Sequence, residues 1–198
     1  EGWVRLFLDA DIAGIRGDWQ RVERDLEQLA SRPWANKERL QSVRAFWLAV
    51  QGRYEDAARS MSLAGPVPEA WTPPVMGGDA NYGLMETAQV RILRATGRKA
   101  DADRLVSKLL DTMRAERQAA GASCESKGGM FAGWMRHASL AANEGLKDEA
   151  VDALRGAMRC GELPPAFLPQ LPWFRQLDGY LPYEALKRER ERRIERIS

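Results

Sequence analysis

The stretch AFWLAVQGRYEDA, residues 45–57, decides the fold class. A glycine at position 52 follows a run of helix-forming apolar residues, and glycine most readily adopts the left-handed conformation with which helices end. Ala45 lies seven residues before this glycine, and Ala57 lies five residues after it. Because residues of this size let two antiparallel helices approach closely, the stretch predicts a helical hairpin that turns at Gly52.

The same pattern occurs three more times along the chain, and internal repetition is the main signal in the sequence. The turn glycines are separated by 35, 45 and 48 residues, and they are Gly17, Gly52, Gly97 and Gly145. The compact residues before and after them are Ala10 and Val22, Ala45 and Ala57, Val90 and Ala102, and Ala138 and Ala150. The two longer separations contain Gly-, Pro- and Ser-rich stretches around residues 65–81 and 119–129, which we expect to be loops. The sequence predicts an all-α chain with hairpins near residues 3–32, 36–64, 82–117 and 130–160.

This pattern resembles the tetratricopeptide repeat, whose usual length is about 34 residues. The matching positions are Gly17-x-Trp19-x-x-Val22, Gly52-x-Tyr54-x-x-Ala57, Gly97-x-Lys99-x-x-Ala102 and Gly145-x-Lys147-x-x-Ala150. The resemblance covers about residues 3–161 and implies a repeat domain over residues 1–161, built as a right-handed solenoid of four stacked hairpins. The alternative is an ordinary helical bundle whose glycine turns coincide. We favour the repeat because internal periodicity is harder to produce by chance than a single motif.

Residues 162–198 do not continue the repeat. LPWFRQL at 171–177 and LPYEAL at 181–186 are near copies ten residues apart, and each places a proline at a helix start, where its missing N–H is not needed. We expect two short helices whose aromatic and leucine side chains cover the open end of the repeat array. Residues 187–198 contain six basic and three acidic side chains, and they predict a polar, solvated extension of the second helix.

This ending carries a second resemblance, to the helical-repeat regions of CadC-like winged-helix transcriptional regulators and of some repeat-containing adenylate cyclases. The matching residues are Pro172-x-Phe174-x-x-Leu177 and Pro182-Tyr183-x-x-Leu186. The resemblance implies that the chain is the C-terminal sensory or regulatory part of a larger bacterial signalling protein. DNA binding would then belong to a segment before residue 1.

The composition excludes several function classes. The 198 residues contain one histidine and two cysteines, too few for a four-ligand Cys/His zinc site or a disulfide-dense scaffold. The 30 Lys and Arg nearly balance the 28 Asp and Glu, so the charge does not predict direct nucleic-acid binding by this segment. The longest clean apolar run, residues 45–50, is far shorter than a membrane span, and no membrane insertion is expected. No motif indicates a metal or another cofactor.

His137, the only histidine, shares a predicted helical face with Trp134, Ala138 and Ala141. A general base needs a positioned partner and a substrate cleft, and no Ser-His-Asp or Cys-His motif surrounds this residue. We therefore expect a packed histidine, and an enzyme active within these residues is the least supported class.

The two cysteines bear on the compartment of the protein. Cys124 precedes the first helix of the fourth hairpin, and Cys160 ends its second helix. Antiparallel helices bring these two ends together, so a disulfide is geometrically possible. A disulfide would favour an oxidising compartment such as the bacterial periplasm, whereas two free thiols would fit the cytoplasm. The sequence leaves both options open.

Helical-repeat arrays normally bind through a concave face lined by the first helix of each pair. By register with the tetratricopeptide pattern, the groove candidates are Phe46, Thr87, Arg91, Arg94, Met135, Ser139 and Asn143. Arg91 and Arg94 share a helical face, and two guanidinium groups could hold a carboxylate, a peptide C-terminus or an acidic segment. The competing interpretation is a solvated charged face.

These features predict a non-catalytic interaction or sensory domain that binds a peptide, a partner protein or a small anionic ligand in its groove. The alternatives are the regulatory repeat region of an adenylate cyclase or another signalling enzyme, and a free-standing scaffold. A homodimer is also compatible with the sequence.

Overall fold

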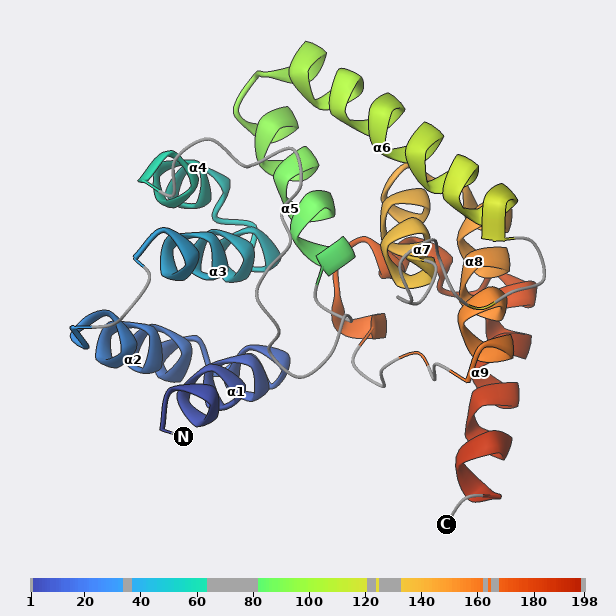
Figure 1. Ribbon diagram of the computed structural model, residues 1–198, viewed down its shortest axis with the longest axis horizontal. Coiled ribbons are helices and arrows are strands. Elements are labelled where there is room, and N and C mark those ends of the chain that lie inside the picture. The colour runs from blue at the N-terminus through green and yellow to red at the C-terminus, as the bar shows by residue number, and fades with distance from the viewer. Residues whose placement is uncertain are drawn as a thin grey trace. The chain divides into compact units, whose positions relative to one another are not determined.

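The computed structural model describes residues 2–33, 37–63, 82–120, 124, 133–161, 164 and 168–196. Every secondary-structure element in this described part is helical, which confirms the predicted all-α class (Figure 1). In chain order the elements are α1 (Gly2–Ile15), α2 (Trp19–Ala30), α3 (Lys37–Val50), α4 (Tyr54–Leu63), α5 (Tyr82–Ala95), α6 (Lys99–Ala120), α7 (Trp134–Asn143), α8 (Lys147–Arg159), the 3-10 helices η2 (Leu168–Gln170) and η3 (Phe174–Leu177), and α9 (Leu181–Glu195).

The four predicted turns share one geometry. Their glycines, at positions 17, 52, 97 and 145, all have a positive φ between 74° and 80°. The N–H after each glycine donates to the carbonyl five residues earlier, at 2.8–2.9 Å: Asp18 to Ala13, Arg53 to Leu48, Arg98 to Leu93 and Leu146 to Ala141. This is the Schellman ending of a helix, and its left-handed residue is why glycine recurs at the turns.

The compact residues around the turns lie in the core. All eight are at most 3% exposed, and they are Ala10, Val22, Ala45, Ala57, Val90, Ala102, Ala138 and Ala150. Helix α1 packs along α2, α3 along α4, and α7 along α8. In these three hairpins, the spacing read from the sequence identifies buried residues at which the paired helices meet.

The chain divides into two compact units, and each is described by itself. Unit 1 comprises Glu1–Asp79 and Ala88–Ala102, and unit 2 comprises Ala80–Thr87 and Asp103–Ser198. The division falls within α5 and α6. The helices after residue 161 belong to the same unit as α7 and α8.

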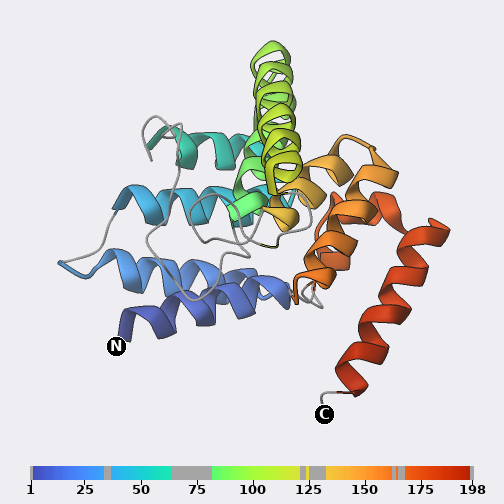
Figure 2. The same cartoon turned by 45° about the vertical axis from the view of Figure 1, so that its right-hand side comes forward.

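In unit 1 the hairpins α1–α2 and α3–α4 lie one above the other (Figure 2). Trp47 of α3 packs on Gly14 of α1, where an added Cβ would lie 2.6 Å from the Trp47 ring. The indole Nε1 of Trp47 donates to Asp11 Oδ1 at 3.3 Å. Arg44 of α3 donates from Nε to Glu23 Oε2 of α2 at 2.9 Å. The first helices of two consecutive hairpins are thereby in direct contact.

Unit 2 contains another contact between a glycine and a tryptophan, and this one lies inside one hairpin. Gly156 of α8 faces the ring of Trp134 of α7, and an added Cβ would overlap that ring. Trp134 is itself buried. The missing side chain at residue 156 therefore provides the space that the indole occupies.

The two predicted C-terminal helices are present as η3 and α9. Their predicted anchors are buried, namely Trp173, Phe174, Leu177, Tyr183 and Leu186. The prediction that residues 187–198 are a solvated extension is wrong for two arginines. Arg190 Nε donates to the Pro164 carbonyl at 2.5 Å, and Arg193 Nη1 donates to the Met158 carbonyl at 2.6 Å. These bonds attach α9 to the last turn of α8 and to the segment that follows it.

Substitution of Gly156 by alanine tests the contact with Trp134. At an ordinary helical position this change stabilises a protein by about 1 kcal/mol, because alanine has the higher helix propensity. Here the overlap with the indole outweighs that gain, and we expect a net loss of about 1–3 kcal/mol in the free energy of unfolding, measured by urea denaturation. The control is the same substitution in a Trp134→Phe background, where the loss should be smaller. An equal loss in both backgrounds would show that the indole is not the cause.

Candidate functional site

Four of the seven predicted groove residues belong to the core. Phe46, Thr87, Met135 and Ser139 are each at most 7% exposed. Thr87 Oγ1 of α5 and Ser139 Oγ of α7 lie 2.8 Å apart and share a hydrogen bond. Side chains this deeply buried pack against other parts of the fold and leave little surface for a ligand.

The contact between α5 and α7 explains the burial of Thr87 and Ser139. Beside the hydroxyl pair, Arg136 of α7 donates from Nε and Nη2 to the carboxylate of Glu86 in α5, at 3.0 and 2.5 Å. The face that would line a groove in an open array is here the face by which two first helices bind each other. The sequence register could not show that a neighbouring helix covers these residues.

The other three predicted residues are half-buried. Arg91 donates to the Tyr54 hydroxyl from Nε at 3.2 Å and from Nη2 at 2.8 Å, and its guanidinium lies 5.8 Å from the centre of the Tyr54 ring. Arg94 lies three residues further along α5 in the same unit. Asn143 belongs to unit 2 and donates to Glu144 at 2.8 Å. The structure therefore retains the arginine pair as a partly exposed cationic feature.

His137 is fully buried at the centre of a polar cluster that joins α6, α7 and α8. Its Nε2 lies 2.5 Å from Glu149 Oε1, and its Nδ1 lies 3.1 Å from Arg117 Nη1. Arg114 holds the same carboxylate with two bonds, from Nε at 2.8 Å and from Nη2 at 2.9 Å. The guanidinium of Arg117 lies 4.7 Å from the centre of the Trp134 ring. A half-buried carboxylate and a buried ring are thereby paired with cations from a neighbouring helix.

The partners of His137 determine its tautomer. Arginine can only donate, so Nδ1 accepts from Arg117, and the ring proton lies on Nε2 and is donated to Glu149. Burial is the main cause that lowers the pKa of His137; the bond to Glu149 opposes it, and the charges of Arg117 and Arg114 add to it. The hydrogen bonds from Arg114 are the main cause that lowers the pKa of Glu149 to about 2. At neutral pH the cluster holds a neutral imidazole and an ionised carboxylate.

This cluster acts as a connector between helices. With 0% of His137 exposed, no substrate can reach the ring. The expectation of a packed histidine is confirmed, but Arg114, Arg117 and Glu149 were not identified from the sequence. These three residues lie on other helices at spacings that carry no motif, so only the packing of α6 and α8 against α7 brings them together.

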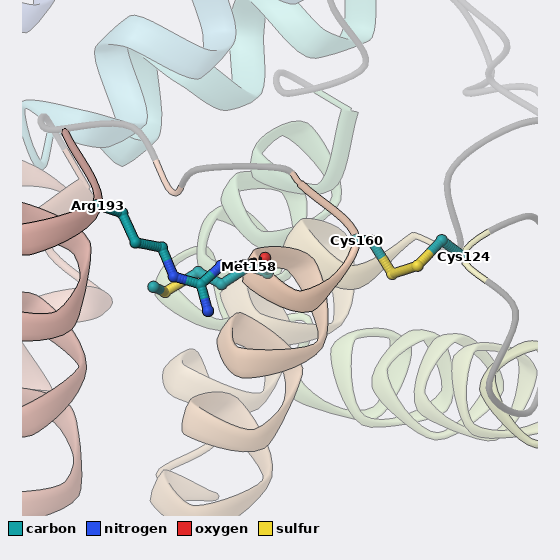
Figure 3. The surroundings of a disulfide bond; sticks show 4 residues. All are labelled: Cys124, Met158, Cys160 and Arg193. Atoms are coloured by element: carbon teal, nitrogen blue, oxygen red, sulfur yellow. Dashed lines mark hydrogen bonds between the residues drawn. A yellow bond between two sulfur atoms is a disulfide. The ribbon is translucent and has the colours of Figure 1, made fainter. Parts of the chain in front are cut away.

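Cys124 and Cys160 form a disulfide, with their Cα atoms 5.2 Å apart. Cys160 is the C-cap of α8. Figure 3 shows the disulfide on one side of the last turn of α8 and Arg193, which reaches the Met158 carbonyl, on the other side. The sequence left the pairing open, and the structure places both cysteines at the end of the hairpin where the antiparallel geometry allowed it.

Within the described ranges there is no group of three or more His, Cys, Asp or Glu residues placed to hold a metal ion. In the same ranges, none of the helices has the length and apolar character needed to cross a bilayer. Comparisons with protein-family models, curated proteins and solved structures found no significant match to this chain.

Acidification should destabilise the fold through His137. A group whose pKa is lowered by folding stabilises the protein above its unfolded pKa of about 6.5, and this contribution is lost as the pH falls through the folded pKa. We expect the free energy of unfolding to fall below pH 6.5 by at most about 1.4 kcal/mol per pH unit. Glu149 is protonated only under more acidic conditions, so it stays ionised over the pH range of 5 to 8. The measurement is urea unfolding across this range.

The matched control is His137→Gln, because glutamine can accept from Arg117 and donate to Glu149 without titrating. Its stability should depend less on pH than that of the wild type. Since the chain has one histidine, its NMR titration is unambiguous. A midpoint at or above the ordinary value of 6.5 would contradict the assignment.

Removal of the disulfide should lower stability without unfolding the separate helices. The bond closes a sequence separation of 36 residues, which corresponds to about 3–4 kcal/mol of unfolding free energy. We expect the reduced protein and the Cys124→Ser/Cys160→Ser variant to lose this amount equally, and the variant to be insensitive to reductant. Thiol titration of denatured, unreduced protein should detect no free thiol. Detection of two would refute the bond.

Proposed function

We propose that this chain is a non-catalytic interaction or sensory module built from tetratricopeptide-like hairpins, and that it forms the C-terminal region of a CadC-like bacterial transcriptional regulator. The observation that carries the proposal is the recurrence of one hairpin design. The same Schellman turn and the same pair of buried compact residues occur four times. A fold that repeats one helical unit is typical of binding arrays.

Contacts between equivalent helices also support the repeat interpretation. In unit 1, Trp47 joins α3 to α1, which are the first helices of two hairpins. In unit 2, Thr87 and Ser139 join the first helices α5 and α7. Arg114 and Glu149 join the second helices α6 and α8. Stacking of first helix on first helix and second on second is the way in which helical repeats bury a continuous core.

The binding surface that we propose is the arginine pair on α5. Arg91 and Arg94 share one helical face, and Tyr54 orients the guanidinium of Arg91. Charge-assisted bonds from guanidinium groups suit a carboxylate-rich peptide segment. The buried candidates, Phe46, Thr87, Met135 and Ser139, are not part of this surface. The disulfide favours action in an oxidising compartment such as the periplasm.

Charge reversal at α5 tests the surface. The probe is fluorescein-labelled hexaglutamate at low salt, with hexaglutamine as the uncharged peptide, and binding is followed by fluorescence anisotropy. We expect Arg91→Glu/Arg94→Glu to weaken hexaglutamate binding at least about tenfold, because two charge-assisted contacts are lost. The matched control is Arg155→Glu/Arg159→Glu, an exposed pair on α8 with the same change in net charge. This control should stay within about twofold of wild type.

Two results would contradict the assignment: equal weakening by both double variants, or absence of hexaglutamate binding by the wild type.

The proposal that the chain belongs to a transcriptional regulator has a separate test, which is the reading frame that encodes the chain. A winged-helix segment encoded before residue 1 would support the regulator. A cyclase domain in that place would instead make this region the regulatory part of an enzyme.

A further inference from the structure

A pocket of about 130 Å³ lies between α8, η2 and α9 in unit 2. Its floor is apolar, because Leu154 and Met158 of α8, Leu168 of η2 and Leu186 of α9 line it. The bond from Arg193 to the Met158 carbonyl holds α9 against the end of α8, at the turn shown in Figure 3. The bond from Arg190 to the Pro164 carbonyl attaches α9 to Pro164. The walls of the pocket are thus connected in the absence of a ligand.

Tyr183 brings a buried polar group to the wall of this pocket. The residue is 3% exposed, and it lines the pocket. Burial raises the pKa of Tyr183 to about 12, so the phenol keeps its proton at neutral pH. It can therefore donate a hydrogen bond to an acceptor in the pocket.

Arg190 adds a cation beside the hydroxyl. Its Nε donates to the Pro164 carbonyl, and within the described ranges no carboxylate forms a salt bridge with it. A guanidinium has five N–H donors, so most of them remain for another acceptor. Lys187, which is paired with Glu184 at 2.7 Å, also lines the pocket. Glu191 also lines the pocket, and because it is exposed, solvent screens the charge of its carboxylate.

From this combination we infer that the pocket binds a small carboxylate that carries a compact apolar group. The apolar group would occupy the leucine-lined floor, and the carboxylate would accept from Tyr183 and Arg190. A cavity of about 150 Å³ is enough for benzene in another protein, so this half-open pocket suits one aromatic ring or a short branched chain. The inference is independent of the proposed peptide surface, because the pocket lies in unit 2 and Arg91 and Arg94 lie in unit 1.

The test uses sodium benzoate as the probe, titrated into the whole chain at pH 7.5 and constant ionic strength. Binding is followed by ¹H–¹⁵N NMR, and we expect saturable shifts for the amides of α8 and α9 around the pocket, with a dissociation constant of about 1 mM. Benzamide, which has the same ring without the charge, should bind at least about tenfold more weakly. Arg190→Gln should also weaken benzoate at least about tenfold while glutamine keeps a donor for Pro164.

Tyr183→Phe provides a second variant that retains the ring and the packing, and it should weaken benzoate about threefold or more. The matched control is Arg188→Gln, which removes an exposed charge from the same helix outside the pocket and should leave binding unchanged. The inference is overturned if benzoate causes no saturable shift in these amides, if benzamide binds as tightly as benzoate, or if Arg188→Gln weakens binding as much as Arg190→Gln.

Discussion

The close approach of paired helices at left-handed glycine turns is the constraint on which the structure depends. A Schellman ending reverses the chain within a few residues, so the second helix must run back beside the first. That path is open only if the side chains at the crossing are small. Alanine or valine occupies the equivalent positions on both sides of all four turns and is almost completely buried there. Larger residues then contact a neighbouring hairpin, as Trp47 does, or lie where a glycine leaves room, as Trp134 does beside Gly156.

Polar groups that are buried between closely packed helices have to form hydrogen bonds with one another, because an unpaired polar group is destabilising away from water. Thr87 and Ser139 do so as two hydroxyls. In the cluster around His137, charged groups form the corresponding hydrogen bonds between helices. Arg114 neutralises Glu149, and a neutral imidazole connects that carboxylate to Arg117 without adding a charge. Breaking either bond of His137 would leave a buried ring nitrogen without its partner, which makes the cluster a determinant of how α6, α7 and α8 fit together.

The sequence predicts features that depend on local spacing and misses those that depend on which elements meet. The turn glycines and their compact neighbours follow a fixed spacing, so the hairpins could be located in advance. The cysteine pair was geometrically possible for the same reason, since both residues end one hairpin. In contrast, the groove register could not reveal that α7 covers Thr87. Nor could spacing associate His137 with Glu149 and Arg117, which belong to different helices and have no shared motif.

The last helix shows why charge composition is a weak guide to a site. Residues 187–198 form an alternating basic and acidic series that is typical of a solvated helix. Yet Arg190 and Arg193, three residues apart, lie on the face that packs against the rest of unit 2. Arg193 caps a carbonyl at the negative end of α8 and is also paired with Glu189, so its charge is locally balanced. Arg190 uses one donor on Pro164 and keeps the others beside an apolar pocket and a buried phenol. The rotation of α9 about its axis, relative to the helix it packs against, decides which arginine can recognise an anion. The number of arginines does not decide it.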